Sequence, residues 1–256
     1  MPDSLEILGK DVPLYGLCFF GGIALAALAA FFIVKKTKIF PLFDLTCSAV
    51  YVMIGAMMGA KLLFVAVSIE DIIELKIPLV NVIKGGFVFY GGLIGGLLGL
   101  FIYAKQFKMS FSMFLELYSV VLPLGHSLGR VGCFFGGCCY GMEYDGPFSV
   151  VYAETVGMTP LNVELLPIQL IEALGLLLLF FLLLILYFKA RDKISCVAVY
   201  AILYSLMRFI LEFFRGDAER GVFFGVSTSQ IISIGLFVFG LFATIKKASL
   251  KNKIPK

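Results

Sequence analysis

The sequence predicts an all-α, polytopic membrane protein: a bundle of seven transmembrane helices. Of its 256 residues, 61% are hydrophobic, and the mean hydropathy is +1.02. Charged residues make up 15%, against about 25% in an ordinary soluble protein. A soluble core of this length cannot hide so much apolar surface, so most of it must face lipid. The composition also excludes a disordered chain, a fibrous repeat and a small disulfide-rich secreted protein.

Seven segments are long enough to cross a bilayer, which requires about 20 mostly apolar residues. The fifth is the clearest, because Gln169 and Glu172 are its only strongly polar members. The first is not expected to be a cleavable signal peptide, because it lacks a basic N-terminal region and follows the polar start MPDSLEILGK. No polar stretch is long enough for a soluble domain, so we expect one integral membrane domain over residues 1–256. In chain order, the predicted spans are 13–34, 44–68, 86–104, 111–131, 167–188, 194–214 and 227–245.

The positive charges predict the orientation of these spans. Thirteen of the 21 Lys and Arg residues follow the first, third, fifth and seventh spans, whereas the 142–166 segment has four acidic residues and no basic one. The positive-inside rule then places the N-terminus outside, the C-terminus in the cytoplasm and a loop at about 132–166 outside. It also explains the net charge of +4 without a nucleic-acid partner. The thirteen residues are Lys35, Lys36, Lys38, Lys105, Lys108, Lys189, Arg191, Lys193, Lys246, Lys247, Lys251, Lys253 and Lys256.

Ionisable residues within the spans are candidates for function because they are costly in lipid. Arg208 and Glu212 are four residues apart, so they share a helix face with Tyr204 and can pair. Such a pair can also serve only to stabilise the bundle. Arg130 has no acidic neighbour in the sequence, so we expect two incompletely neutralised guanidinium groups and an anionic ligand, since Arg binds phosphate bidentately. The other candidates are Lys61, Glu116, His126, Glu172 and Arg215.

Glycines mark two further regions of interest. Gly91 and Gly92 follow Tyr90, and we expect them to break the helix and line a cavity. Gly95 and Gly99 are expected to allow close helix packing. His126, the only histidine, lies in a Gly-His-Ser-Leu-Gly-Arg stretch. A lone histidine near a helix end is more often structural than catalytic, but these neighbours make it a candidate catalyst.

The segment 129–141 reads GRVGCFFGGCCYG and combines Arg130 with Cys133, Cys138 and Cys139. The Gly136-Gly137 pair should end the helix and start a re-entrant or interfacial loop. The spacing C-x4-C-C is not that of the usual zinc sites, and a fourth ligand is unassigned, so the sequence predicts no metal site. The thiols are expected either to line a pocket or to act chemically, for example as a redox pair.

Ordered motifs along residues 13–245 resemble the prolipoprotein diacylglyceryl transferase family. The matches are Tyr15-Gly16-Leu17, Tyr90-Gly91-Gly92-Leu93, Glu116, Gly129-Arg130-Val131-Gly132 with Gly141, Pro167-Ile168-Gln169-Leu170-Ile171-Glu172, the run from Tyr204 through Arg208, Glu212, Phe213 and Phe214 to Arg215, and Gln230. The chain also departs from the family pattern. Cys133 and Gly136 replace two Asn residues, Cys138 replaces a Glu, and Tyr90 replaces a His.

The resemblance implies an enzyme of the bacterial cytoplasmic (inner) membrane. Its substrates would be phosphatidylglycerol and the lipobox Cys of a preprolipoprotein signal peptide, it would need no cofactor, and it would release glycerol phosphate. Because the reference pKa of Tyr is about 10, Tyr90 is a poor base, and either His126 or the field of the arginines must replace the His of the family. The expected catalytic residues are Arg130, Arg208, Tyr90 and His126. The expected substrate-binding residues are Tyr15, Gly91, Gly92, Cys133, Cys138, Gly141, Tyr204, Glu212 and Arg215.

Two other functions remain open because the signature is only partly retained. The first is a related lipid-modifying or thiol-dependent membrane enzyme with a different acceptor. The second is a transporter of an anionic lipid or small molecule, with the arginines as its binding site.

Overall fold

The computed structural model describes residues 4–7, 9–74, 78, 80, 82, 85–152, 157–217, 222–223 and 226–252. Glu154, Lys253 and Lys256, which supported the predicted orientation, lie outside these residues. The helices are α1 (Leu14–Thr37), α2 (Leu42–Val67), α3 (Ile69–Ile73), α5 (Phe89–Gln106), α6 (Phe111–Phe135), α7 (Ile168–Ala190), α8 (Cys196–Leu211), the 3-10 helix η1 (Glu212–Phe214) and α9 (Thr228–Asn252). Three short antiparallel pairs accompany them: β1 (Ser4–Ile7) with β2 (Lys10–Pro13), β3 (Val150–Val151) with β4 (Glu164–Leu165), and β5 (Val222–Phe223) with β6 (Val226–Ser227).

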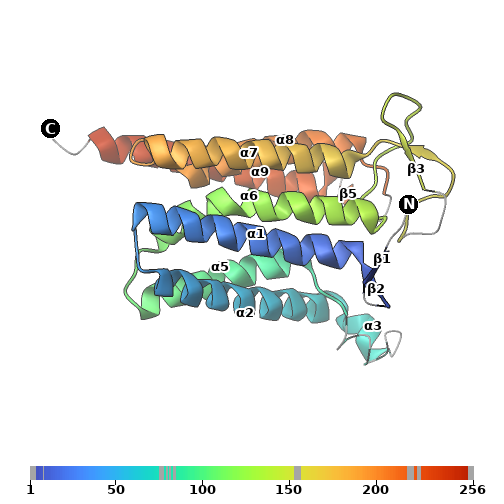
Figure 1. Cartoon of the computed structure of the whole chain (residues 1–256), viewed down its shortest axis with the longest axis horizontal. Helices are drawn as coiled ribbons and strands as arrows, with labels where there is room; N and C mark the ends of the chain where they lie inside the picture. The colour runs from blue at the N-terminus through green and yellow to red at the C-terminus, as the bar shows by residue number, and fades with distance from the viewer. Residues whose placement is uncertain are drawn as a thin grey trace. The chain divides into compact units, whose positions relative to one another are not determined.

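The helices confirm an all-α, polytopic membrane protein (Figure 1). Within the described part of the chain, six helices are long and apolar enough to cross a membrane: α1, α2, α6, α7, α8 continued by η1, and α9. They match six of the seven predicted spans. The third predicted span corresponds to α5, which has only 18 residues and is not among these six helices.

The chain forms two compact units, one of Met1–Ala29 with Glu116–Lys256 and the other of Ala30–Leu115. In the second unit, α2 and α5 are in backbone contact through glycines. A Cβ atom added to Gly95 would collide with the carbonyl of Gly55, and one added to Gly91 would collide with the carbonyl of Gly59. Gly99 meets the backbone of Tyr51 in the same way. Helices in lipid associate through such small residues, which let the backbones approach closely.

This packing confirms the expectation for Gly95 and Gly99 but corrects the one for Gly91 and Gly92. Both residues lie inside the continuous helix α5, so they do not break the backbone around a cavity. Gly91 is buried against α2, and its lack of a side chain makes that contact possible. The sequence pattern of a broken helix and that of a glycine-packed helix are alike, and only the neighbouring helix distinguishes them.

Two ionisable residues within the spans have local structural partners. In the second unit, the ammonium of Lys61 donates hydrogen bonds to the carbonyls of Val82 and Gly85, and it lies 4.9 Å from the ring centre of Phe87. A lysine inside a helix is thereby used to hold the segment before α5.

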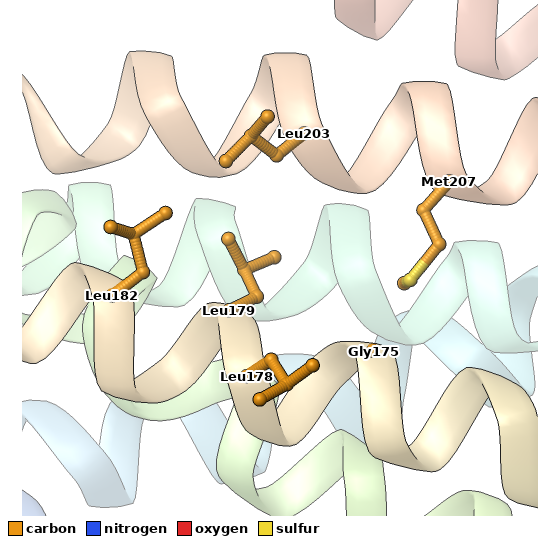
Figure 2. Close-up of a pocket in the computed structure, with 6 residues that line it drawn as sticks. All are labelled: Gly175, Leu178, Leu179, Leu182, Leu203 and Met207. Carbon is orange, nitrogen blue, oxygen red and sulfur yellow. The ribbon is translucent and has the colours of Figure 1, made fainter.

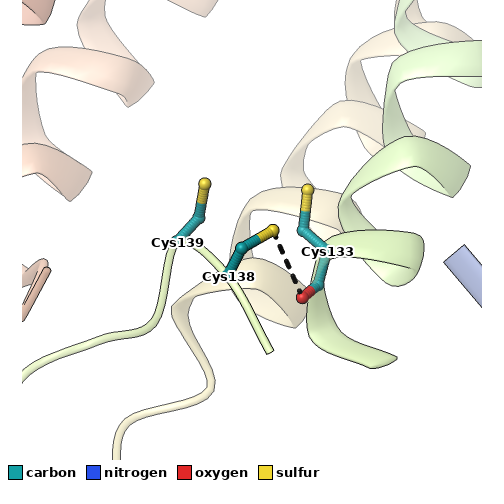
Figure 3. Close-up of side chains that lie close together, drawn as sticks. All are labelled: Cys133, Cys138 and Cys139. Carbon is teal, nitrogen blue, oxygen red and sulfur yellow. Dashed lines mark hydrogen bonds between the residues drawn. The ribbon is translucent and has the colours of Figure 1, made fainter. Parts of the chain in front are cut away.

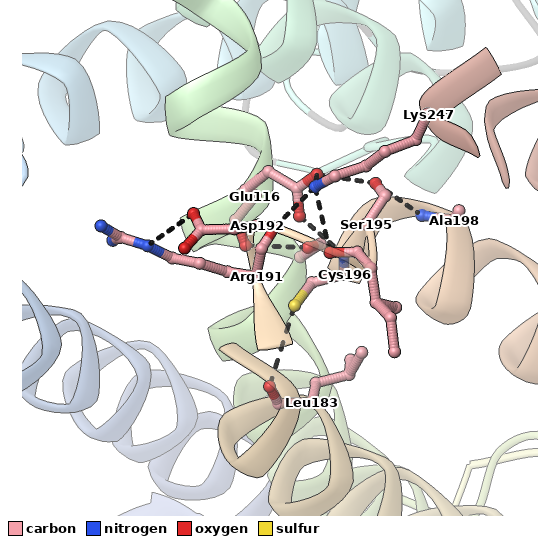
Figure 4. Close-up of polar contacts among 10 residues, drawn as sticks. Glu116, Leu183, Arg191, Asp192, Ser195, Cys196, Ala198 and Lys247 are labelled. Atoms are coloured by element: carbon pink, nitrogen blue, oxygen red, sulfur yellow. Dashed lines mark hydrogen bonds and ion pairs between the residues drawn. The ribbon is translucent and has the colours of Figure 1, made fainter. Parts of the chain in front are cut away.

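Glu116 anchors the start of α8 in the first unit (Figure 4). Its carboxylate accepts hydrogen bonds from the Ser195 hydroxyl and from the Cys196 backbone N–H, both at 2.6 Å. The ammonium of Lys247 in α9 lies 3.7 Å from the same carboxylate. Unpaired N–H groups at a helix N-terminus need acceptors of this kind. Glu116 therefore joins α6, α8 and α9, which is a structural role.

Candidate active site

The loop after α6 brings three cysteines together. The helix ends at Phe135, four residues beyond the predicted span, and the turn at Gly136 and Gly137 follows where the sequence predicts that the helix cannot continue. The chain then folds back, so that the Cys138 N–H donates to the Cys133 carbonyl at 3.1 Å. The Sγ atoms of Cys133, Cys138 and Cys139 all lie within 4.8 Å of one another (Figure 3). We call these three residues the thiol cluster.

Positive φ angles shape this loop. Gly137 has φ +60° and Cys139 has φ +57°, in the left-handed region that favours glycine. A cysteine held there indicates that the surrounding contacts determine the backbone. One such contact comes from Gln169, which is 2% exposed and whose side-chain amide donates to the Cys138 carbonyl at 2.9 Å.

Gly141 fixes the other end of the loop. It pairs as an antiparallel bridge with Arg215, and the flanking bonds run from Met142 N–H to the Phe214 carbonyl at 2.9 Å and from Gly216 N–H to the Tyr140 carbonyl at 3.0 Å. A Cβ atom on Gly141 would collide with the Leu166 carbonyl, so no other residue fits. The signature glycine thus has a clear steric reason.

The cluster cysteines differ in their readiness to ionise. Hydrogen bonds from the Cys133 and Cys138 thiols lower the pKa of Cys139 against the opposing effect of burial. The positive charges of Arg215 and Arg130 lower that pKa further. The pKa of Cys138 is raised, because its thiol is hydrogen-bonded to the other two and is partly buried. A single thiolate in the cluster is therefore favoured at Cys139.

Arg215 remains a cation beside this cluster. Its guanidinium donates to both carboxylate oxygens of Asp217, with a 2.9 Å bond from Nε. Burial alone would lower the pKa of Arg215, but the bonds to Asp217 and the nearby Cys139 raise it. The pair supplies little net charge, although it keeps a guanidinium at the loop.

Arg130 has an acidic partner, contrary to the expectation from sequence. Its Nε lies 3.1 Å from a carboxylate oxygen of Glu172 in α7, and the two side chains are 13% and 3% exposed. Neither of these atoms has a hydrogen bond of good geometry within the described residues. Because Glu172 is 42 positions away in the chain, inspection of the neighbours of Arg130 could not reveal the pair.

Arg208 and Glu212 pair as their spacing predicts. The Arg208 Nη2 atom lies 2.7 Å from the Glu212 carboxylate, and the two side chains are 10% and 3% exposed. In the part of the chain that the structure describes, Nη1 of Arg208 is buried and has no hydrogen-bond partner. Buried donors are nearly always satisfied, so this atom is a candidate contact for a ligand.

The same face of α8 carries Tyr204, which contacts His126 of α6. Their ring centres are 5.5 Å apart in an edge-to-face arrangement, and Tyr200 stacks on Tyr204 at 5.4 Å. Two residues chosen separately from the sequence thus lie together. Tyr15 lies near the end of α6: a Cβ atom added to Gly132 or Gly136 would sit 3.4 Å from its ring.

An apolar groove of about 240 Å³ runs between α7 and α8 (Figure 2). It begins at Gly175, three residues after Glu172, and Met207 next to Arg208 lines it. The groove and the ion pairs therefore occupy adjacent turns of the same helices. Its lining residues are Gly175, Leu178, Leu179, Leu182, Leu203 and Met207.

Known proteins resemble this chain over most of its length. The sequence model of the family described as prolipoprotein diacylglyceryl transferase matches residues 2–246. The chain belongs to the prolipoprotein diacylglyceryl transferase family. Three relatives named phosphatidylglycerol–prolipoprotein diacylglyceryl transferase, the second with the number 2 added, come from Clostridium tetani, Clostridium perfringens and Helicobacter hepaticus. They are 34%, 31% and 30% identical over 94%, 92% and 99% of this chain and 95%, 91% and 92% of their own lengths.

Within the prolipoprotein diacylglyceryl transferase family signature, the structure links two further residues to the site, of which the sequence analysis had named Glu172 only as a candidate within the spans. Glu172 pairs with Arg130, and Gln169 holds the loop backbone. Their signal was present, since they are the only strongly polar residues of α7 before Lys189 in its last turn. Tyr90, Gly91 and Gly92 belong to the second compact unit and remain assigned by resemblance.

Proposed function

We propose that this transferase moves a diacylglyceryl group from phosphatidylglycerol to the thiol of a lipobox Cys in a preprolipoprotein. The names of the relatives supply phosphatidylglycerol and prolipoprotein as substrates. In this reaction the carbon–oxygen bond between the diacylglyceryl group and the phosphate breaks. A thioether forms, glycerol phosphate leaves, and the thiol proton is released. The enzyme acts in lipoprotein biosynthesis.

The observation that carries the proposal is the buried Nη1 atom of Arg208, which has no hydrogen-bond partner among the described residues. A phosphate oxygen would satisfy it. Because Glu212 and Glu172 already balance the charges of Arg208 and Arg130, the anion is bound through preorganised donors more than through net charge. The same donors stabilise the charge that develops on the departing phosphate.

The other proposed site residues lie on the helices beside the arginines and on the loop after α6. His126 and Tyr204 offer polar atoms beside the arginines, and Tyr15, Cys133 and Cys138 lie at the end of α6. Gly141 and Arg215 hold the loop against the start of α7. Tyr90, with Gly91 and Gly92, enters the proposal through the family resemblance alone.

The groove between α7 and α8 suits an acyl chain of the donor. Its lining is apolar, and Leu178 and Leu203 are 62% and 38% exposed, as expected for a groove open to lipid. A lipid whose phosphate meets Arg208 could lay one chain along Met207 and Leu203 without leaving the bilayer.

For the topology, we propose a single integral membrane domain with seven spans, of which α5 is the third. Lysines lie in or just beyond the last turns of α1, α5 and α7 and in the C-terminal part of α9, which supports a cytoplasmic C-terminus and an outside N-terminus. The loop at about 132–166 then faces outward from the bacterial cytoplasmic membrane. Cysteine-accessibility labelling at positions 36, 154 and 251 checks this, and a cytoplasmic residue 154 would disprove it.

The direct test of function is mass analysis of a lipobox peptide incubated with purified protein and phosphatidylglycerol. We expect a diacylglyceryl thioether on the wild-type peptide and none on a matched peptide with Ser in place of the lipobox Cys. No adduct with any lipobox peptide would contradict the proposal.

A second candidate is a related enzyme that uses its own thiols on a different acceptor. The clustering of three Sγ atoms within 4.8 Å favours this alternative. It predicts a covalent adduct on a cluster cysteine in intact-protein mass spectra, which the first proposal does not.

A further inference from the structure

The thiol cluster is held in place mainly by backbone contacts, beside one bond from a sulfur atom, which runs from the Cys138 thiol to the Cys133 carbonyl at 3.7 Å (Figure 3). Cys133 is fixed in the last turn of α6, and Cys138 is tied to it by the 3.1 Å backbone bond. The Cys138 carbonyl is held by the buried Gln169, and the Cys139 backbone adopts a left-handed conformation at φ +57°. The loop thus directs three side chains toward one point before any ligand binds.

The spacing of the sulfur atoms suits a metal ion. Zinc–thiolate bonds of about 2.3 Å in a tetrahedral site place the sulfur atoms roughly 3.8 Å apart. The Sγ atoms of Cys133, Cys138 and Cys139 all lie within 4.8 Å of one another, so small side-chain rotations suffice. Three thiols cannot all be paired in disulfides among themselves, which disfavours a purely oxidative role for the cluster.

We propose that Cys133, Cys138 and Cys139 form a three-thiolate site for a zinc ion, and that the fourth position receives the acceptor thiol. The second part rests on the proposed transferase function. The absence of a fourth ligand made a structural zinc site improbable from the sequence. Catalytic zinc sites, however, keep one position open for water or substrate.

Such a site would supply the activation that Tyr90 cannot. A thiol bound to zinc loses its proton, which passes to solvent. The resulting sulfur attacks the diacylglyceryl carbon as the carbon–oxygen bond to phosphate breaks, and glycerol phosphate carries away the electron pair. The product thioether has no charge, binds zinc weakly and leaves. No electron is gained or lost by the metal.

The surrounding charges fit this assignment. Three thiolates on Zn²⁺ carry one net negative charge, and the guanidinium groups of Arg215 and Arg130 act electrostatically on Cys139. Glu172 and Asp217 already pair with these guanidinium groups, so the guanidinium groups offset the negative charge of the zinc–thiolate group only in part.

Metal binding is measured first, without substrate. The full-length protein is purified in detergent under anaerobic, reducing conditions, stripped with a chelator, and titrated with Zn²⁺ or Co²⁺. We expect one bound ion per chain and a thiolate-to-cobalt charge-transfer band. Replacing Cys133, Cys138 or Cys139 by Ser should weaken binding at least tenfold, whereas Cys47→Ser in α2 serves as the matched control and should not.

Transfer to a lipobox peptide is then compared for stripped and zinc-loaded wild-type protein, which avoids variants that fail to fold. At least tenfold loss on stripping and recovery with zinc supports the proposal. A wild-type protein that binds no ion, or whose binding survives all three substitutions together, overturns the site. Binding with transfer unaffected by stripping overturns its role in thiol activation. Binding without any diacylglyceryl transfer contradicts the proposed function and leaves the metal site supported.

Discussion

The α2–α5 pair and the α6–α8 region both pack helices in lipid, but by opposite means. Between α2 and α5, glycines such as Gly55 and Gly95 bring the backbones into contact. In the α6–α8 region, the buried partners are charged: Arg130 of α6 meets Glu172 of α7, and Arg208 of α8 meets Glu212 one turn later in η1, which continues α8. Backbone contact gives stability at little polar cost, whereas buried ion pairs must overcome desolvation and are a weak source of stability. Function, rather than stability, therefore accounts for the buried charges of the α6–α8 region.

The largest effect should come from the charged region. Arg130→Lys and Arg208→Lys keep the charge but lose the forked donors, so each should reduce diacylglyceryl transfer about 100-fold or more. Steady-state transfer to a lipobox peptide measures this. Arg191→Lys, at an exposed ion pair with Asp192, is the matched control and should retain activity. If both Lys variants of the buried arginines kept full turnover, the phosphate would not be bound there.

Substitutions in the glycine-packed α2–α5 pair should lower the stability of the protein rather than its activity. Gly95→Val would force α5 away from Gly55, and we expect it to cost about 3 kcal/mol or to prevent folding. Gly235→Val in α9 is the control, because an added Cβ atom there meets nothing within 4 Å. Thermal unfolding in detergent followed by size exclusion compares the two. Equal stability of both variants would contradict the close α2–α5 contact.

A smaller effect is expected from the groove between α7 and α8. Leu203→Phe should fill part of it and raise the KM for long-chain phosphatidylglycerol by roughly tenfold, with a smaller change for a short-chain analogue. Leu206→Phe is the control, since Leu206 is exposed but does not line the groove. A change that is the same for both chain lengths would rule out acyl binding in the groove.

The smallest expected difference lies within the thiol cluster. Because the pKa of Cys139 is lowered and that of Cys138 is raised, Cys139 remains a thiolate at lower pH. In metal-free protein, iodoacetamide at pH 6 should therefore label Cys139 before Cys138, and the selectivity should shrink as pH rises. Peptide mass mapping gives the order of labelling. Faster labelling of Cys138 would show that the hydrogen bonds within the cluster favour a thiolate at Cys138 and not at Cys139.

The sequence was sufficient wherever a property depends on composition or on short spacing. Apolar length located the helices, the four-residue spacing predicted the Arg208–Glu212 pair, and Gly136-Gly137 predicted the end of α6. Each of these depends on neighbours within a turn or two, where helix geometry is fixed. The family motifs also indicated the function from the sequence, because each motif is recognised from its residues in their order along the chain.

Only the tertiary structure decided what depends on approach between distant segments. The partner of Arg130 is 42 residues away, Gly91 proved to be a packing residue because α2 lies against it, and three cysteines of unfamiliar spacing converge because the loop folds back through a left-handed Cys139. A sequence shows which groups are costly to bury, but their partners are chosen by which helix faces meet. That is why the sequence by itself determined a membrane transferase with buried arginines, and the fold decided which carboxylates hold those arginines and which sulfur atoms come together.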